Sequence, residues 1–212
     1  MSTWIELFPD LLPGLWVTIK LTLLALGLGL PCGVVLAGLS AAPSRWVRWP
    51  VIVVVEIGRG VPGLIVLYLV YRGLPQVDVV LSAFLSAGVG LAFSTAAYTA
   101  EIIRAGIAAV PVGHREAARA LSLSPLQEFR LVVLPQALRT VIAPLVGFSI
   151  ILYQGTSLAY AISVPELLSR AYNAASITFQ FGAALTLAGA MYAVVSLTAT
   201  ALAGARSRER VL

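Results

Sequence analysis

Two pairs of oppositely charged residues lie within or beside long apolar segments. Glu56 precedes Arg59 by three residues, and Glu101 precedes Arg104 by the same spacing. This spacing places both members of a pair on one face of a helix, where a carboxylate and a guanidinium can pair. Two interpretations stay open. The four residues form an inner gate that rearranges, or they are static pairs that fix helix register while the arginines reach toward lipid headgroups.

A second set of polar side chains falls inside the apolar segments and could line a path for a small solute. The set comprises Lys20, Tyr98, Gln154, Thr156 and Ser157. The ammonium of Lys20 could meet a carboxylate, although extension toward the headgroups is the interpretation that we favour. Hydroxyl and amide groups could bond a zwitterionic solute, or they could join neighbouring helices to one another.

Covalent catalysis and metal binding find little support in the sequence. His114 is the only histidine and Cys32 the only cysteine, so neither a Ser/His set nor a Cys/His cluster exists. No glycine-rich stretch ends in Gly-Lys-Ser or Gly-Lys-Thr, the pattern whose backbone cradles phosphates. We therefore expect a chain without enzyme activity that binds no metal and no cofactor of its own.

The composition points to a membrane. Of the 212 residues, 59% are hydrophobic and 11% are charged, whereas soluble domains carry about 25% charged residues. A soluble enzyme, a disordered chain and a disulfide-stapled module are therefore excluded, and the net charge of +5 does not indicate nucleic acid. We expect one all-α transmembrane domain over residues 1–212, because at least four uncharged stretches exceed the roughly 20 residues needed to cross a bilayer. The five expected spans cover residues 12–36, 51–71, 79–103, 140–163 and 179–203.

Arginine placement predicts the orientation of these spans. Ten arginines lie between spans one and two, between spans three and four, or after span five, against two in the opposite connections. Basic residues favour the cytoplasmic side, so the N-terminus is expected outside and the C-terminus inside. Because Glu6 and Asp10 precede the first span, we do not expect a removable signal peptide. Gly58, Gly60 and Pro62 predict a bend in the second span.

The longest polar interruption, residues 104–139, predicts a helical hairpin at the cytoplasmic face. A first helix is expected from Arg115 to Leu123, Pro125 interrupts the chain, and a second helix is expected from Leu126 to Val133, ending at Leu134-Pro135. Small alanine side chains on the first helix would let another protein approach closely. The alternative is an amphipathic helix resting on lipid.

Several segments of the chain resemble the permease subunits of ATP-binding-cassette importers. The hairpin, residues 112–121 and 134–137, is similar to their EAA loop. Residues 55–62, 97–104, 156–158 and 164–168 resemble, in order, signatures of the permeases that serve importers of histidine, glutamine, glutamate and arginine. Residues 14–18 of the first span also fit, so the resemblance covers nearly the whole chain, from about residue 12 to 203.

The sequence departs from the family pattern at three places. Ser122 replaces the usual glycine of the loop, and we expect a negative φ there because serine avoids the left-handed region. His114 replaces a glutamine. Gln154 and Gly155 stand where the family has a lysine and an acidic or amide residue, which affects expectations about the substrate.

The resemblance implies a multi-pass subunit in the bacterial cytoplasmic membrane that imports a polar amino acid. Its expected partners are a dimeric ATPase that uses ATP and Mg²⁺, a second permease subunit and an extracytoplasmic solute-binding protein. The expected ATPase-coupling residues are Arg115, Glu116, Ala117, Ala118, Arg119, Ala120, Leu121 and Ser122. From the residues alone, Glu116 could instead cap the hairpin helix through its first turn.

Other functions would leave different signatures. A permease for quaternary amines or another small organic solute is the alternative within this class. An ATP-independent secondary carrier would place coupling-ion ligands near the membrane midplane, and we find no acidic residue there. A scaffold protein would leave the hairpin unexplained.

Overall fold

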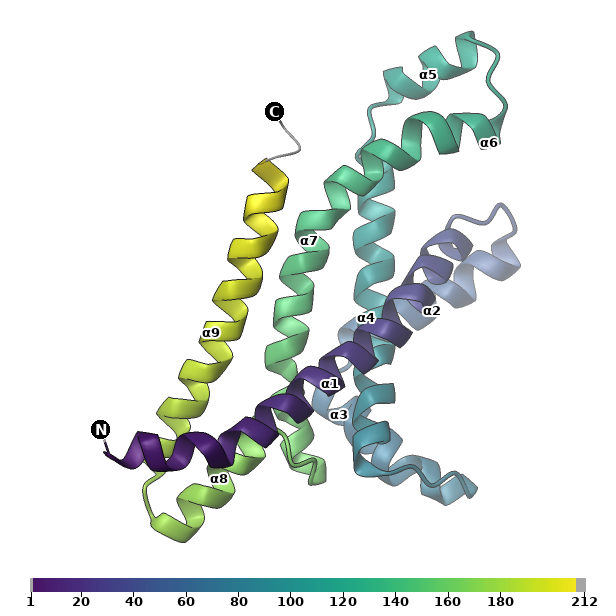
Figure 1. The fold of residues 1–212 in the computed structure, drawn as a ribbon. Coiled ribbons are helices and arrows are strands. Elements are labelled where there is room, and N and C mark those ends of the chain that lie inside the picture. Colours follow the sequence, from purple (N-terminus) through teal and green to yellow (C-terminus); the bar gives the residue numbers. More distant parts are fainter. Residues whose placement is uncertain (1, 209–212) are drawn as a thin grey trace.

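The computed structural model describes residues 2–208, and every regular element among them is helical (Figure 1). The elements, in chain order, are α1 (Ser2–Ser40), α2 (Arg45–Gly60), α3 (Gly63–Tyr68), η1 (Leu69–Gly73), η2 (Leu74–Val77), α4 (Ala83–Ala108), α5 (Val112–Ala120), α6 (Pro125–Glu128), η3 (Phe129–Val133), α7 (Leu134–Gly155), η4 (Thr156–Ile162), α8 (Leu167–Thr178) and α9 (Phe181–Arg208). Arg210 lies outside the described residues, as do the side chains of Arg206 and Arg208.

Helix α4 is the centre of the bundle, and α1 crosses it at close range (Figure 1). Gly29 and Gly33 lie one turn apart on the buried face of α1, opposite Thr95 and Thr99 of α4. Both threonine hydroxyls donate to the carbonyl one turn earlier in their own helix, at 2.7 Å. Two helices can approach closely in an apolar medium where their facing residues are small and where each hydroxyl is hydrogen-bonded within its own helix.

The second span is broken, as the glycines and proline predict. Helix α2 ends at Gly60, Val61 and Pro62 are extended, and the following helical segment turns by 105° relative to α2. The missing N–H of Pro62 and the weak helix propensity of Gly58 and Gly60 explain a break at this point.

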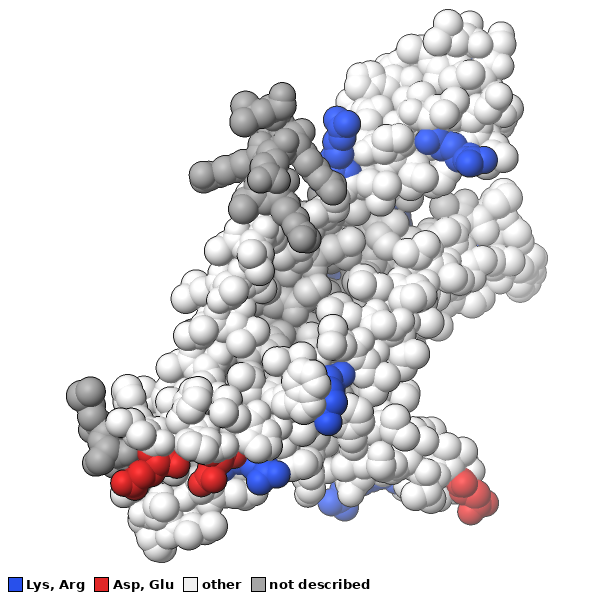
Figure 2. Space-filling model, viewed as in Figure 1, with Lys and Arg blue, Asp and Glu red and all other residues white. Residues whose placement is uncertain are grey.

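Four described helices are long and apolar enough to cross a membrane, or five if the broken α2–α3 pair forms one span. This count agrees with the expected five, although the helix boundaries differ. The first candidate span, Trp4–Ser40, is longer than expected at both ends, and the fourth, Pro125–Ile162, begins earlier than expected because the helix of the hairpin continues into it. On the face drawn in Figure 2, charged side chains gather toward the ends and the broad middle zone is almost free of them.

The predicted end of the second hairpin helix at Leu134-Pro135 is wrong. The helix continues from α6 through the wider π turn η3 into α7. In this wide turn, the Leu134 N–H reaches back to the Phe129 carbonyl, and Pro135 falls in the first turn of α7. The shifted hydrogen-bond register tolerates a residue without an N–H, so the proline does not interrupt the helix.

The expected negative φ at Ser122 is also wrong. Ser122 adopts φ 56°, in the left-handed region. The N–H of Leu123 donates to the Ala118 carbonyl at 3.2 Å, and the N–H of Ser122 donates to the Arg119 carbonyl at 2.9 Å. These two bonds form a Schellman motif, which requires a left-handed residue after the helix whatever its side chain.

We predict that Gly29→Ala weakens the contact between α1 and α4. The added Cβ would lie 2.5 Å from Cβ of Thr95 and 2.9 Å from the Ala92 carbonyl oxygen, so the helices must separate. The expected loss of stability is about 1–3 kcal/mol, read from the loss of helical circular dichroism on heating the purified protein. Gly27→Ala is the matched control, because a Cβ there meets nothing within 4 Å. A control that loses as much stability would contradict this account.

Replacing Ser122 with glycine should stabilise the hairpin. Glycine adopts the left-handed conformation without the strain that a Cβ causes there, and we expect a gain of up to about 1 kcal/mol, reduced by the greater backbone entropy of glycine in the unfolded chain. The same thermal measurement checks it. Ser124→Gly serves for comparison: it removes the side chain that accepts from the Gln127 N–H at the start of α6 and should lower stability.

Candidate functional site

The hairpin made by α5, α6 and η3 projects beyond the bundle, on the side where α9 ends and opposite the start of α1 (Figure 1). Its first arm presents Glu116, Ala117, Ala120 and Leu121 to the exterior, and Leu121 is 77% exposed. Ser122 continues this exposed surface at the turn. We call these five residues the hairpin surface.

Ala118 differs from its neighbours because it is buried within the hairpin itself. It therefore supports the hairpin from within. Glu116 lies in the second turn of α5, and the first turn contains no acidic residue. The interpretation of Glu116 as a first-turn cap is thus not supported by its position.

Interactions within the chain fix the shape of the hairpin. Nε of Arg119 donates to Oε2 of Glu128 at 2.9 Å, which joins the two arms. This hydrogen bond, together with the charge of Glu128, raises the pKa of the Arg119 guanidinium. At the base, the His114 ring and the Gln136 side chain lie 2.7 Å apart. The hairpin is therefore a rigid unit joined to α7.

The two predicted ion pairs form and meet each other through one carboxylate. Nη1 of Arg59 lies 3.3 Å from Oε1 of Glu56 and 4.0 Å from Oε2 of Glu101. Glu101 also accepts two bonds from Arg104, at 2.8 and 2.5 Å. Glu101 thus links Arg59 of α2 to Arg104 near the end of α4, and we call Glu56, Arg59, Glu101 and Arg104 the charge cluster.

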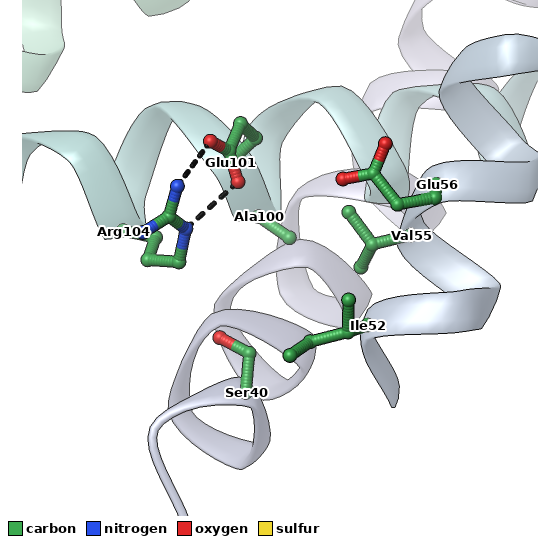
Figure 3. A pocket seen from close by; sticks show the side chains of 7 residues that line it. All are labelled: Ser40, Ile52, Val55, Glu56, Ala100, Glu101 and Arg104. Atoms are coloured by element: carbon green, nitrogen blue, oxygen red, sulfur yellow. Dashed lines mark hydrogen bonds and ion pairs between the residues drawn. The ribbon is translucent and has the colours of Figure 1, made fainter. Parts of the chain in front are cut away.

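A pocket of about 250 Å³ opens beside the charge cluster. Figure 3 shows its lining from three helices: Ser40 ends α1, Glu56 comes from α2, and Glu101 and Arg104 come from α4. Charged and apolar side chains therefore share one small space, where α1, α2 and α4 converge.

Tyr98 lies close to this cluster, one turn before Glu101 on α4. Its hydroxyl donates to the Arg59 carbonyl at 3.2 Å, and its ring stacks on that of Phe148 with 5.2 Å between centroids. Tyr98 and Phe148 also line an open, mainly apolar groove between α4 and α7. The structure therefore brings Tyr98 together with the charge cluster, a contact that helical spacing alone did not predict.

The other expected pathway residues do not join this region. Nε2 of Gln154 donates to the hydroxyl of Ser196 on α9 at 3.3 Å, which is a helix-to-helix contact. Thr156 is buried and bonds the Tyr153 carbonyl, while Ser157 bonds the Gln154 carbonyl. Lys20 is exposed on α1 and belongs to neither group.

One buried carboxylate, Glu166, was not among the expected site residues. Glu166 is fully buried at the start of α8, where it accepts the N–H groups of Leu168 and Ser169 and the hydroxyl of Tyr192, all at 2.7–2.9 Å. Burial raises the pKa of Glu166, while these hydrogen bonds oppose the rise. Thr18 of α1 accepts the Leu167 N–H at 3.2 Å, so polar side chains join α1, α8 and α9 here. An acidic residue directly after a proline and before a helix was the signal that could have revealed this cap.

The described residues contain no group of three or more His, Cys, Asp or Glu side chains placed to hold a metal ion. The structure instead contains two features that could transmit movement. One is a rigid hairpin whose second helix continues into α7, and the other is the charge cluster between α2 and α4.

The chain is similar to proteins that are all named as parts of amino-acid transport systems. The chain is 33% identical to the probable amino-acid ABC transporter permease protein y4tG of Sinorhizobium fredii, over 93% of this chain and 86% of the relative. It is 32% identical to the arginine transport system permease protein ArtQ of Bacillus subtilis, over 98% and 95% of the two chains. A crystal structure of an amino acid ABC transporter with histidines matches with a TM-score of 0.94 at 31% identity, covering 98% of this chain and 97% of the other.

The family model described as "Binding-protein-dependent transport system inner membrane component" matches residues 29–209. This range includes the second to fifth candidate spans, the charge cluster and the hairpin. The similarity thus extends over the features that the geometry singles out. The chain belongs to the family of binding-protein-dependent transport system inner membrane components, multi-pass permeases of ABC transporters.

Proposed function

We propose that this chain is the permease subunit of an ABC importer that carries a polar amino acid into the cytoplasm. ATP hydrolysis with Mg²⁺ takes place in a separate ATPase dimer, and an extracytoplasmic binding protein delivers the solute. A second permease subunit completes the pathway in the bacterial cytoplasmic membrane. The names of relatives such as the arginine permease ArtQ support the substrate class. Membership of the family supports the assignment of ATP hydrolysis and solute delivery to separate proteins.

One observation carries the proposal: the hairpin surface is exposed while the hairpin interior is fixed. Leu121 is 77% exposed although it is apolar, and Glu116 and Ala117 on the same arm are exposed as well. An exposed apolar side chain next to small residues and a carboxylate suits a cleft on another protein. Because η3 and α7 continue the hairpin helix, a push on this surface moves the fourth span as a rigid body.

This assignment places the hairpin on the cytoplasmic side. The excess of arginine in the connections at that end supports the same orientation, with the N-terminus outside and the C-terminus inside. The start of α1 and α8 would then face the binding protein.

Glu116→Lys should uncouple the permease from its ATPase. Reversal of charge on the hairpin surface opposes docking, and buried or half-buried charge pairs between proteins contribute several kcal/mol, so we expect a fall of about ten-fold or more in amino-acid-stimulated ATP hydrolysis. The measurement uses the whole transporter reconstituted in vesicles with its binding protein.

Arg130→Glu is the control, since Arg130 is exposed on η3, outside the hairpin surface, and the change also reverses a charge. It should leave stimulated hydrolysis within about two-fold of wild type. Uptake that survives Glu116→Lys without ATP would refute the importer and favour a secondary carrier.

We further propose that the charge cluster is an inner gate that separates when the ATPase closes. Glu101 is the residue through which both ion pairs are linked, and the salt bridge from Arg59 is long at 4.0 Å. A link of this length is weak and breaks readily, whereas the short bidentate pair with Arg104 holds Glu101 in position.

Glu101→Gln should therefore raise hydrolysis that is not coupled to transport. Loss of the shared carboxylate removes both links, and we expect about a five-fold fall in amino acid carried per ATP, corresponding to about 1 kcal/mol of bias between the two states. Glu56→Gln is the comparison, because Glu56 is 63% exposed and contributes only the outer pair. Equal transport per ATP in wild type and Glu101→Gln would favour static pairs.

A further inference from the structure

The start of α2 carries an exposed group of aromatic and basic side chains. Trp46 and Trp49 are 91% and 57% exposed, and Arg45 beside them is exposed as well. Arg48 is half-buried, and its Nη1 donates to the Ala42 carbonyl at 3.5 Å. We call Arg45, Trp46, Arg48 and Trp49 the tryptophan–arginine surface.

An apolar stripe continues from the two tryptophans along the exposed face of α2. Val53 and Ile57, each 50% exposed, follow Trp49 at intervals of four residues, so these side chains lie on one face of the helix. On the opposite face, Val55 is buried with Ala100 of α4. The stripe therefore has no partner among the described helices and suits contact with acyl chains.

The turn between α1 and α2 starts at the edge of the hydrocarbon core. The uncharged helical run of α4, residues 83–100, is about 27 Å long at 1.5 Å per residue, against a core of about 30 Å. Glu101 therefore lies at the edge of the core. Ser40 and Ile52, which flank the turn, line the same pocket as Glu101.

The tryptophan–arginine surface consequently lies among the lipid headgroups. Trp46 is six residues before Ile52, about 9 Å along the helix. Because α2 runs obliquely to α4, the distance from the edge of the core is smaller (Figure 1). Headgroups extend a bilayer by about 5–7 Å on each side, and tryptophan is enriched at this depth. The turn also lies short of the level at which α4 ends, whereas the hairpin projects beyond it (Figure 1).

The positive charge of this surface is not compensated by the chain. Neither Arg45 nor Arg48 forms an ion pair within the part of the chain whose side chains are described. The first acidic residue after them in the sequence is Glu56, which pairs with Arg59. Guanidinium groups are well suited to phosphate oxygens, and two of them without a counter-charge favour an anionic headgroup over a zwitterionic one.

We propose that the tryptophan–arginine surface binds anionic phospholipids of the cytoplasmic leaflet. The phosphate lies on Arg45 and Arg48, and the indole rings of Trp46 and Trp49 lie where the headgroups meet the acyl chains. This binding goes beyond the proposed function, and only the choice of leaflet rests on the proposed orientation. Because α2 also contributes two residues to the charge cluster, lipid bound here would steady that helix beside α4.

The test is fluorescence quenching in the whole transporter, reconstituted in vesicles of equal parts phosphatidylglycerol and phosphatidylcholine. Either one lipid or the other is brominated, so the composition stays constant. The signal of the two tryptophans is the difference between wild type and Trp46→Phe/Trp49→Phe. We expect brominated phosphatidylglycerol to quench this signal about two-fold or more strongly than brominated phosphatidylcholine, and the preference to fall as salt is raised.

Arg45→Gln/Arg48→Gln should abolish this preference, because the charges that select the headgroup are lost. Arg130→Gln/Arg139→Gln is the matched control: it removes the same charge from exposed positions on η3 and α7 and should keep the preference. Helical circular dichroism on heating establishes that each variant is folded.

Three results would overturn the proposal: equal quenching by both lipids in wild type, a preference that survives Arg45→Gln/Arg48→Gln, or a control that loses it as well. Absence of quenching by either lipid would also overturn it, because a protein partner would then cover the surface. Both leaflets have the same composition and no ATP is added. Failure here is therefore distinct from failure of the importer assignment.

Discussion

The close contact of α1 with α4 is the constraint on which the other elements depend. In an apolar medium no hydrophobic force drives helices together, so packing and satisfied polar groups must do so. Gly29 and Gly33 admit the threonines of α4, and α4 uses further small residues toward α2 and α7, where Gly58 faces Ala97 and Gly106 faces Val141. With α4 fixed, Glu101 and the root of the hairpin are fixed as well.

Much of this arrangement follows from the sequence, because membrane helices are limited by simple rules. Runs of apolar residues gave the number of spans, and a spacing of three placed Glu56 with Arg59 and Glu101 with Arg104. The break at Pro62 was also predictable, since glycine and proline weaken a helix locally. These features depend on neighbours in the sequence, and periodicity reports them directly.

Contacts between distant segments escaped prediction. The approach of Arg59 to Glu101 depends on how α2 packs on α4, and the burial of Glu166 depends on Tyr192, which lies 26 residues away. Local rules also failed where the backbone compensates. Pro135 was expected to end a helix, and Ser122 was expected to avoid a positive φ, yet a wide turn and a Schellman motif accommodate both.

The wide turn at Phe129–Val133 has a mechanical consequence. A π turn holds one residue more than an α turn spanning the same height, so it offsets the rotational phase of everything before it by about 100°, the angle of one residue. A single inserted residue therefore sets the direction in which the hairpin projects from the fourth span. In a relative without this inserted residue, the same segment would project from its span in a direction rotated by about 100°.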